Sequence, residues 1–467
     1  MGILPFFIFA TVVVWSWGRE ALGEFGGLCA VLLFSTLPPV LGNAGLATTD
    51  IVLTATFIAA SLELMHWLQR PTYVRGCLLG FAVALSVLSK FSALLFLPVC
   101  GMAMLVCYLA SKDRRPRLSR QWRSGATALA LSGMIALLVV WGGYRFSDHR
   151  TDKAERPHAV IDRIVGANGV LHDVAYFAAE HVPIPAPELI KGIEYQRLHN
   201  SNGSASYLFG QARQGGWWYF YPIVLAIKTP LPFLILSAIG LFSLAIAGFR
   251  GADWRVLAAA AMAVALLLSA MPSGIDLGVR LILPIYPLLA IVAAFGAIKL
   301  WNLAKPKFLG RALVSALLLW QVVSCLAAHP DYLSYFNPFA GSSPERIDVG
   351  PDLDWGQDLF RLSDELRARH ITSFSIAYLG SADLTQQNLP HFVELAPFHP
   401  VTGWIAISLT RLMRGDTNPP YYGYSWLRSC KPVARVGRSI LLYHVPAGGC
   451  PSRAMTETSP KPPSTVT

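Results

Sequence analysis

Long apolar runs separated by short polar turns fill the first two thirds of the chain. A helix crosses the ~30 Å apolar core of a bilayer in about 20 residues, because it rises 1.5 Å per residue. About ten runs are long enough to span, or nearly span, that thickness. They lie near residues 3–17, 26–41, 51–68, 76–89, 91–110, 125–143, 221–248, 256–271, 281–299 and 310–328. The pattern predicts an all-α polytopic membrane domain over residues 1–328, with about ten transmembrane helices.

One apolar stretch is too long for a single span. Residues 76–110 would form a helix of about 52 Å, and Ser89-Lys90 is its only polar break. We therefore expect the chain to fold back there, about 21 Å from the start of the first arm and short of the far membrane surface. An ammonium group at that depth is costly unless it meets an anion or a water-filled cavity. The alternative is a lysine whose aliphatic stem lets its charge reach the membrane surface.

After residue 328 the pattern changes to mixed helical and strand spacing. Apolar residues of helical spacing cover Trp355–His370, with Asp354 as the expected N-cap. The expected strands are Ile371–Leu379, Trp404–Leu409, Lys431–Val436 and Ser439–Val445. Residues 329–450 therefore predict one independently folded α/β domain. Residues 451–467 are rich in Ser, Thr and Pro and predict a disordered tail.

A second large non-membrane segment is the loop over residues 144–220. A loop of this length is usually functional rather than a simple connection. It ends in the aromatic run Trp217–Tyr221, which is typical of re-entry at the membrane interface. Glu194 and Tyr195, within this loop, are candidate substrate-binding residues.

Composition agrees with a membrane protein, since 54% of the residues are hydrophobic and the mean hydropathy is +0.47. The formal net charge of +11 comes from basic residues that collect in alternate loops, most densely between residues 112 and 123. By the positive-inside rule these loops are cytoplasmic. No basic face interleaved with aromatic residues is present, so we expect no nucleic acid as a partner.

Alternation assigns the remaining polar segments to the outer face. These are the Asn43–Asp50 turn, the tip at Lys90, the 144–220 loop, the 272–280 loop and everything after His329. The sequence therefore predicts a multi-pass protein of the cell membrane with an extracytoplasmic C-terminal domain. An oxidising outer compartment allows Cys430 and Cys450 to pair, but sequence alone leaves the paired and the free states open.

Four ionisable residues border apolar runs on this same face: Asp50, Lys90, Lys228 and Arg280. Such residues are costly in a membrane and are retained mainly where they line a cavity or a site. A carboxylate and three cations at one depth predict a site for an anionic head group. Asp50 is the catalytic candidate, because a carboxylate there could orient or deprotonate an acceptor hydroxyl. The alternative for Asp50 is a helix N-cap.

The cations and one further carboxylate are candidate substrate-binding residues. Arg280 offers the planar, multi-donor group that suits phosphate, and Lys228 precedes a Thr-Pro-Leu-Pro helix start. Asp276, four residues before Arg280, is also a candidate, and an internal Asp276–Arg280 pair is the alternative. The sequence has no P-loop, HExxH or CxxC motif, and its histidines lack ligand spacing. No metal site is predicted, and a divalent metal as cofactor is left open.

Several short motifs together resemble one family. They are Ala47–Asp50 (ATTD), Leu88–Ala93 (LSKFSA), Gly216–Phe220 (GWWYF), Lys228–Pro232 (KTPLP) and Gly278–Pro287 (GVRLILPIYP). In their order and spacing they resemble the GT-C membrane glycosyltransferases. The nearest group is glycosyltransferase family 39, the protein O-mannosyltransferases and aminoarabinose transferases. His329–Asn337 (HPDYLSYFN) and Asp354–Asp358 (DWGQD) resemble the outer domain of bacterial members.

The resemblance implies a membrane enzyme that moves a sugar, with inversion, from a polyprenyl-phosphate donor to a protein, lipid or glycan acceptor at the outer face. It implies that Lys90 and Arg280 bind the lipid phosphate and that Asp50 matches an acidic residue of the second outer loop. The family's first helix and first outer loop, which carries its catalytic carboxylate, have no counterpart in this sequence. We therefore expect donor binding with poor transfer. The alternatives are a transporter or flippase of a lipid-linked anion and an inactive donor-binding homologue.

Overall fold

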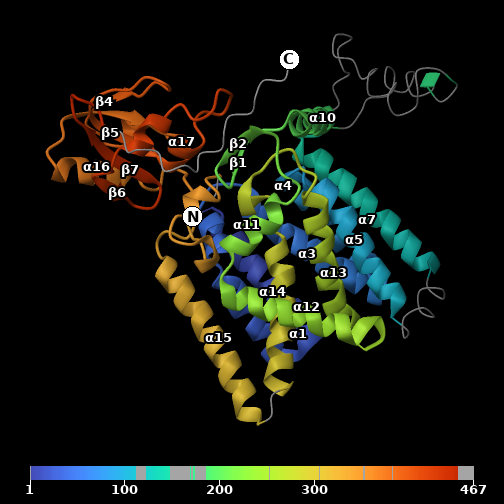
Figure 1. The fold of residues 1–467 in the computed structure, drawn as a ribbon. Helices are drawn as coiled ribbons and strands as arrows, with labels where there is room; N and C mark the ends of the chain where they lie inside the picture. The colour runs from blue at the N-terminus through green and yellow to red at the C-terminus, as the bar shows by residue number, and fades with distance from the viewer. Residues whose placement is uncertain are drawn as a thin grey trace. The chain divides into compact units, whose positions relative to one another are not determined.

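The computed structural model describes residues 2–111, 122–147, 169, 172–173, 186–251, 253–303, 306–350, 353–380 and 382–450 (Figure 1). The chain divides into two compact units. Unit 1 comprises Met1–Ser204 and Gly215–Gly341, and unit 2 comprises Ala205–Gln214 and Ser342–Thr467. The division differs from the predicted boundary at residue 328, because the segment from His329 to Gly341 packs with unit 1. The predicted tail and residues 148–168, 170–171 and 174–185 of the 144–220 loop lie outside the described residues.

Unit 1 is helical. Its helices are α1 (Leu4–Ser35), α2 (Pro38–Ala44), α3 (Asp50–Gln69), α4 (Tyr73–Ser89), α5 (Ala93–Ala110), α7 (Trp122–Gly143), α10 (Pro187–Asn202), α11 (Phe220–Lys228), α12 (Leu231–Gly251), α13 (Trp254–Ala270), α14 (Ile285–Leu303) and α15 (Lys307–Ala328). Within the described residues, six helices are long and apolar enough to cross a membrane, or up to seven if the bent pair α1–α2 is one span. Helices α4 and α13 are apolar but shorter. The fold is that of a multi-pass membrane protein, and the count falls below the predicted ten by this criterion.

The first helix, α1, is a hairpin of two antiparallel arms. Its backbone leaves helical geometry at Gly23, where φ is +80°, a conformation that glycine adopts without strain. A Cβ on Gly18 would lie 3.1 Å from the Cα of Gly27, although nine residues of continuous helix would separate them by about 13 Å. Two of the predicted spans, 3–17 and 26–41, therefore correspond to the two arms of one hairpin.

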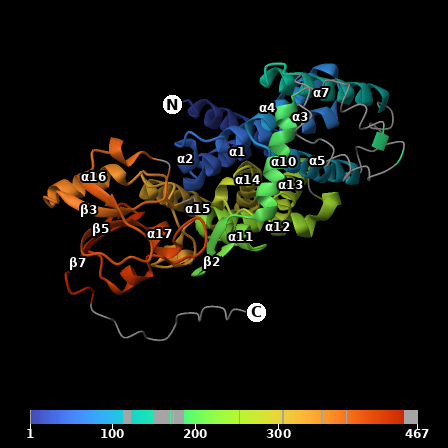
Figure 2. The same ribbon diagram turned by 90° about the horizontal axis from the view of Figure 1, so that it is seen from above.

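Small residues let α4 and α7 touch backbone to backbone. Gly76 and Gly80 are spaced as in a GxxxG pattern, and a Cβ on either would overlap the carbonyl oxygen of Ala128 or Ser132 on α7. Membrane helices associate through close packing of this kind, because lipid offers no hydrophobic driving force between them. Elsewhere α5 packs against α13, and α12 crosses α14 (Figures 1 and 2).

We expect Gly80→Ala to destabilise unit 1 by about 1–3 kcal/mol, because the added methyl group forces the α4 and α7 backbones apart. Gly133→Ala is the matched control on α7, since a Cβ there meets no atom within 4 Å. Thermal unfolding of both variants in detergent tests the expectation. Equal transition temperatures for the two variants would contradict it.

A charged cluster lies at the end of unit 1 that contains the tip of the α1 hairpin. At the hairpin tip, Glu20 lies 2.8 Å from the imidazole of His66, and Arg75 pairs with Glu63 at 2.9 Å. The indole of Trp17 donates to the carbonyl of Arg255. These contacts join the tip of α1 to the α3–α4 turn and to the start of α13. Three of the predicted cytoplasmic segments thus meet at one end of the unit.

Unit 2 contains a five-stranded mixed sheet in the order β4-β3-β5-β7-β6. The strands are β3 (Ser373–Ala377), β4 (His391–Glu394), β5 (Gly403–Ser408), β6 (Ala434–Val436) and β7 (Ile440–Val445). Strands β4 and β5 run parallel to β3, whereas β7 is antiparallel to both β5 and β6. Helix α16 (Leu359–Ala368) buries Leu359, Leu362 and Leu366 against the sheet residues. All four predicted strands are present, and β4 is an addition.

A separate hairpin completes unit 2. Strands β1 (Ala205–Leu208) and β2 (Gln211–Gln214) pair with each other and bond to residues distant in the chain. The hydroxyl of Tyr422 accepts from the amide of Ala212 at 2.6 Å, and Arg414 donates to the carbonyl of Ala205. A chain of residues 329–450 alone lacks this hairpin.

The DWGQD motif does not form the predicted helix start. Gly356 adopts a φ of +88°, and its amide donates to Asp354 in a local turn, so the helix begins only at Leu359. Asp358 is fully buried and accepts hydrogen bonds from the backbone amides of Arg438 and Ser439. It therefore holds the β6–β7 turn rather than capping α16 through its side chain.

Asp354 is buried near Asp358, and few groups compensate the charge of its carboxylate. One carboxylate oxygen accepts from Gly356, and the other is buried with no hydrogen-bond partner among the described residues. Burial raises the pKa of Asp354 to about 7, and the neighbouring charge of Asp358 adds to the rise. The hydroxyl of Tyr378, close to Gly356, is likewise buried without a partner in the described part of the chain.

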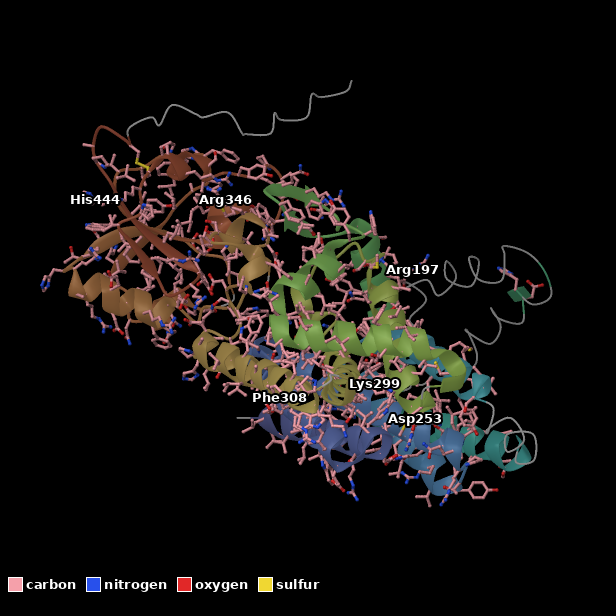
Figure 3. All side chains as sticks on the ribbon, turned by 60° about the horizontal axis from the view of Figure 1, so that its bottom comes forward. Arg197, Asp253, Lys299, Phe308, Arg346 and His444 are labelled. Carbon is pink, nitrogen blue, oxygen red and sulfur yellow. A yellow bond between two sulfur atoms is a disulfide. The ribbon has the colours of Figure 1, made fainter. Side chains whose placement is uncertain are left out.

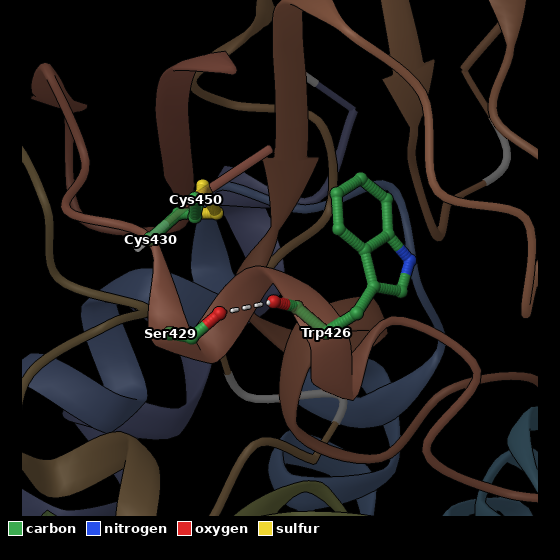
Figure 4. Close-up of a disulfide and its surroundings, with 4 residues drawn as sticks. All are labelled: Trp426, Ser429, Cys430 and Cys450. Atoms are coloured by element: carbon green, nitrogen blue, oxygen red, sulfur yellow. Dashed lines mark hydrogen bonds between the residues drawn. A yellow bond between two sulfur atoms is a disulfide. The ribbon is translucent and has the colours of Figure 1, made fainter. Parts of the chain in front are cut away.

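The two cysteines of unit 2 form a disulfide. Cys430 and Cys450 are joined with their Cα atoms 5.3 Å apart, next to the short turn in which Ser429 donates to the carbonyl of Trp426 (Figure 4). The sequence left this pairing open, and the structure pairs the two residues. The other five cysteines, in unit 1, are free.

Candidate functional site

An ion-pair cluster joins three of the predicted site residues. The carboxylate of Asp50 accepts from the ammonium group of Lys90 at 2.7 Å through Oδ1. Its Oδ2 accepts from Nε and Nη2 of Arg280 at 2.9 and 2.8 Å. Asp50 is 1% exposed, whereas Lys90 and Arg280 keep 22% and 14% of their side chains accessible. The accessible surface of these three side chains therefore belongs to the two cations.

The helix lengths explain why Lys90 and Asp50 meet. Helices α3 and α4 pack together and are joined by a short turn at residues 70–72, so the start of α3 returns to the level of the end of α4. Asp50 begins α3, and Lys90 follows the last residue of α4 in an extended conformation. The chain folds back at Lys90, as its polar break predicts.

Arg280 reaches the cluster from a third element. It ends the 3₁₀ turn η1 (Gly278–Arg280), which connects α13 to α14. The alternative of an isolated Asp276–Arg280 pair does not account for its position, since Arg280 makes a two-pronged contact with Asp50. Asp276 is buried and accepts from the backbone amide of Trp217, and Gly216 admits it because a Cβ there would overlap its carboxylate.

Lys228, the fourth predicted member of the charged site, makes its described contacts elsewhere in unit 1, with Leu333 and Phe336. It is 1% exposed, and its ammonium group donates to the carbonyl of Leu333 at 3.2 Å. The same group lies 3.8 Å from the centre of the Phe336 ring, a cation–π distance. Its helix, α11, nevertheless packs against η1, which carries Arg280.

Glu194 and Tyr195 lie on α10 and are exposed. The Tyr195 ring stacks on that of His199, with centroids 6.1 Å apart. Helix α10 lies over the neighbourhood of the cluster, because a Cβ on Gly192 would overlap the ring of Phe91, the residue after Lys90. The structure brings Asp50, Lys90 and Arg280 together and leaves Glu194 and Tyr195 on this covering helix.

An apolar cavity of about 320 Å³ lies among α3, α4, α5, α7 and α13. Leu79, Val83, Leu97, Leu129 and Met262 are among its lining residues. Val83 precedes Lys90 by seven residues, which is about 10 Å along the helix axis. Within the described ranges, no group of three or more His, Cys, Asp or Glu side chains could hold a metal ion.

Sequence reasoning missed Asn337, which is 2% exposed and bonds to the end of α11. It also missed the hydroxyls of Tyr221 and Tyr286, which bond around η1. The available signal was the HPDYLSYFN segment, which ends in Asn337, together with the helix-breaking Pro230. That segment was expected in the outer domain, where it would have had no access to α11.

Comparisons with known proteins bear on the membrane part. Residues 4–141 match the model of a family described as dolichyl-phosphate-mannose-protein mannosyltransferase. ArnT from Cupriavidus metallidurans bound to undecaprenyl phosphate is 14% identical, with 95% of this chain and 83% of that chain covered, at a TM-score of 0.42. The apo state of ArnT from Cupriavidus metallidurans is also 14% identical, with 94% of this chain and 82% of that chain covered, at a TM-score of 0.41. No curated protein matches the sequence.

A structural likeness this low assigns no residue a role. The family match, however, falls on the segment that holds Asp50 and Lys90 and agrees with motifs found independently in the sequence. The resemblance of the chain to the GT-C membrane glycosyltransferases is confirmed on that basis.

Proposed function

We propose that this chain is a membrane glycosyltransferase that takes its sugar from a polyprenyl-phosphate donor, whose phosphate binds to Lys90 and Arg280. The observation that carries the proposal is the ion-pair cluster around Asp50, in which the two cations are partly accessible and the carboxylate is not. Charge-assisted hydrogen bonds from an ammonium and a guanidinium are the strongest that a phosphate can receive. The apolar cavity below Lys90 would hold part of the polyprenyl chain.

The proposed reaction is a direct displacement with inversion. The acceptor oxygen attacks C1 of the sugar, the C1–O bond to phosphate breaks, and the bonding electrons stay on the phosphate oxygen. Lys90 and Arg280 stabilise the charge that develops there, so the leaving group needs no proton. The acceptor proton goes to Asp50. Bound phosphate would compete for the two cations and so release the carboxylate oxygens that they occupy in the free protein.

The remaining predicted residues are proposed to act around this centre. Asp276 supports the Gly216-Trp217 turn, and Lys228 supports the helix behind Arg280. Glu194 and Tyr195 are proposed to meet the acceptor, because α10 lies over Phe91 and exposes both side chains. The acceptor class stays open among protein, lipid and glycan.

Transfer is proposed to take place on the outer face of the cell membrane, with unit 2 on that side. Two observations support this side. The basic loops 112–123 and their alternates are expected in the cytoplasm by the positive-inside rule. The disulfide between Cys430 and Cys450 is typical of an oxidising compartment.

Binding of a polyprenyl phosphate to the full chain in lipid nanodiscs tests the donor site. We expect Lys90→Gln to weaken binding about 10- to 100-fold, because a hydrogen bond to a charged group is lost. Lys299→Gln is the matched control, since Lys299 is an exposed lysine on α14, well separated from Arg197 of α10 (Figure 3). Equal affinities for the two variants would refute the assignment.

A transfer assay separates the proposal from its alternatives. Membrane vesicles that contain the chain receive a donor with a labelled sugar, and the label is followed into protein, lipid and glycan fractions. A glycosyltransferase consumes the donor and releases polyprenyl phosphate. A transporter moves the intact donor between leaflets, and an inactive homologue binds it without either outcome.

A further inference from the structure

The junction between α11 and α12 leaves backbone carbonyls without helical partners. Pro230 has no N–H group, so the carbonyl of Ala226, four residues earlier, cannot receive its usual helical bond. The next carbonyls, at the end of α11, are also without donors from their own helix. Buried carbonyls of this kind need donors from elsewhere in the structure.

Asn337 supplies those donors. Its side-chain amide donates to the carbonyls of Ala226 and Thr229, both at 2.6 Å. Its backbone amide donates to the carbonyl of Ile227 at 2.8 Å, and its side-chain oxygen accepts from Phe339 at 2.9 Å. Asn337 is 2% exposed, and every hydrogen-bonding group of its side chain is in use. One buried residue thus completes the end of α11.

The same segment holds Lys228. We name residues Leu333–Asn337 the strap. Its first residue accepts from the ammonium group of Lys228, and the ring of Phe336 lies under that group. On its other side, the backbone of Leu333 lies against Gly42 of α2, where no side chain would fit. The strap therefore fixes both the backbone and the charged side chain at the end of α11.

Helix α11 in turn holds the turn that carries Arg280. Near its start, the hydroxyl of Tyr221 donates to the carbonyl of Ile275 at 2.7 Å. Just after its end, the hydroxyl of Thr229 lies 3.0 Å from that of Tyr286. Ile275 precedes η1 in the sequence and Tyr286 follows it, so these two hydrogen bonds flank η1. Helix α11 also packs against η1 itself. A shift at the end of α11 would therefore move the guanidinium group of Arg280.

We propose that Asn337 is a positioning residue for the phosphate site, acting through α11 on Arg280. This inference rests on the proposed donor site and extends it to a residue that touches neither the donor nor Asp50. Without the side-chain amide of Asn337, the carbonyls of Ala226 and Thr229 have no hydrogen-bond donor, so the end of α11 must move until water or another N–H or O–H group reaches them. Arg280 then loses its placement, and a small misplacement of such a group has a large effect on binding.

A double-mutant cycle on the full chain in nanodiscs tests this, with polyprenyl phosphate as the probe. We expect Asn337→Ala to weaken binding about tenfold in the wild-type background. In the Arg280→Ala background it should change the affinity less than about twofold, because residues that act through one another are not additive. A residue that only stabilises the fold would lower affinity equally in both backgrounds, and that result would overturn the inference, as would no effect in either.

The matched control is Gln321→Ala. Gln321 is also a fully buried amide, and it donates to one backbone carbonyl, that of Thr36, at 3.1 Å. It should lower thermal stability as Asn337→Ala does and leave the affinity unchanged. Asn337→Ser keeps one donor and replaces the alanine variant if that variant fails to fold. Absence of binding by the wild-type chain would instead refute the donor site itself, so the two failures are distinguishable.

Discussion

Replacing Asp50 by asparagine should lower the rate of sugar transfer by about 10²–10⁴-fold, the range typical of a lost general base. Asparagine keeps the size of the side chain but cannot accept the proton of the acceptor hydroxyl. It also weakens the contacts that hold Lys90 and Arg280 at 2.7 to 2.9 Å from one carboxylate. Donor affinity should change less than the rate, because the substitution leaves both cations in place. The measurement is the single-turnover rate at saturating donor, together with donor affinity.

Asp253→Asn is the matched control for this experiment. Asp253 is also a carboxylate at the start of a membrane helix, and it pairs with Arg255 at 2.6 Å. It is labelled in Figure 3 and lies far from Arg197 of α10. A wild-type rate in the Asp50→Asn variant would refute a catalytic role. A defect confined to donor affinity would show that Asp50 only holds the two cations together.

The second large effect concerns the stability of unit 2. Asp354→Asn should stabilise it above pH 7 by on the order of 4 kcal/mol, since three pKa units separate the folded value of about 7 from the ordinary one. Between pH 4 and 7 the folded protein keeps a proton on Asp354 that the unfolded chain has lost. Stability therefore falls as the pH rises through this range, and the loss is complete above about pH 7. Asparagine cannot ionise and avoids the loss.

Amide hydrogen exchange in strands β5 and β7 of the full chain measures this difference. At pH 8 the variant should exchange more slowly than the wild type, and near pH 4 the two should agree. Asp364→Asn is the control, because Asp364 is 79% exposed on the neighbouring helix α16. Faster exchange in the Asp354→Asn variant at pH 8 would mean that the ionised carboxylate stabilises the unit.

Apolar patterning located most helices of unit 1 but only some of the points where the chain bends or folds back. The fold-back at Lys90 could be predicted because a polar pair interrupts a run too long for one span. Thr229-Pro230 was recognised as a helix start, yet the run over 221–248 was counted as one span because it stays apolar across that point. The stability of this junction depends on the hydrogen-bond donors of Asn337, over 100 residues away. A hydrogen bond between residues so far apart in the chain leaves no local pattern in the sequence.

The site was predicted in its composition but not in its pairing. Asp50, Lys90 and Arg280 could each be recognised as a charge beside an apolar run. Which cation meets Asp50 depends on helix packing, and so Lys228 turned out to face Phe336 instead. In unit 2, burial of Asp354 follows from the left-handed backbone of Gly356, and helical spacing alone suggested a cap.

The β1–β2 hairpin has a consequence for biosynthesis. Its residue Ala212 bonds to Tyr422, 210 positions later, and ribosomes add about 5–20 residues per second. Tyr422 is therefore synthesised roughly 10–40 s after the hairpin sequence is complete. An isolated two-stranded hairpin is only marginally stable in water, so β1 and β2 do not stay paired over that time. Between the two events the cell must insert several apolar helices. Assembly of unit 2 thus becomes a late event in translation, and nascent chains stalled before Tyr422 should expose these two strands to proteases and chaperones.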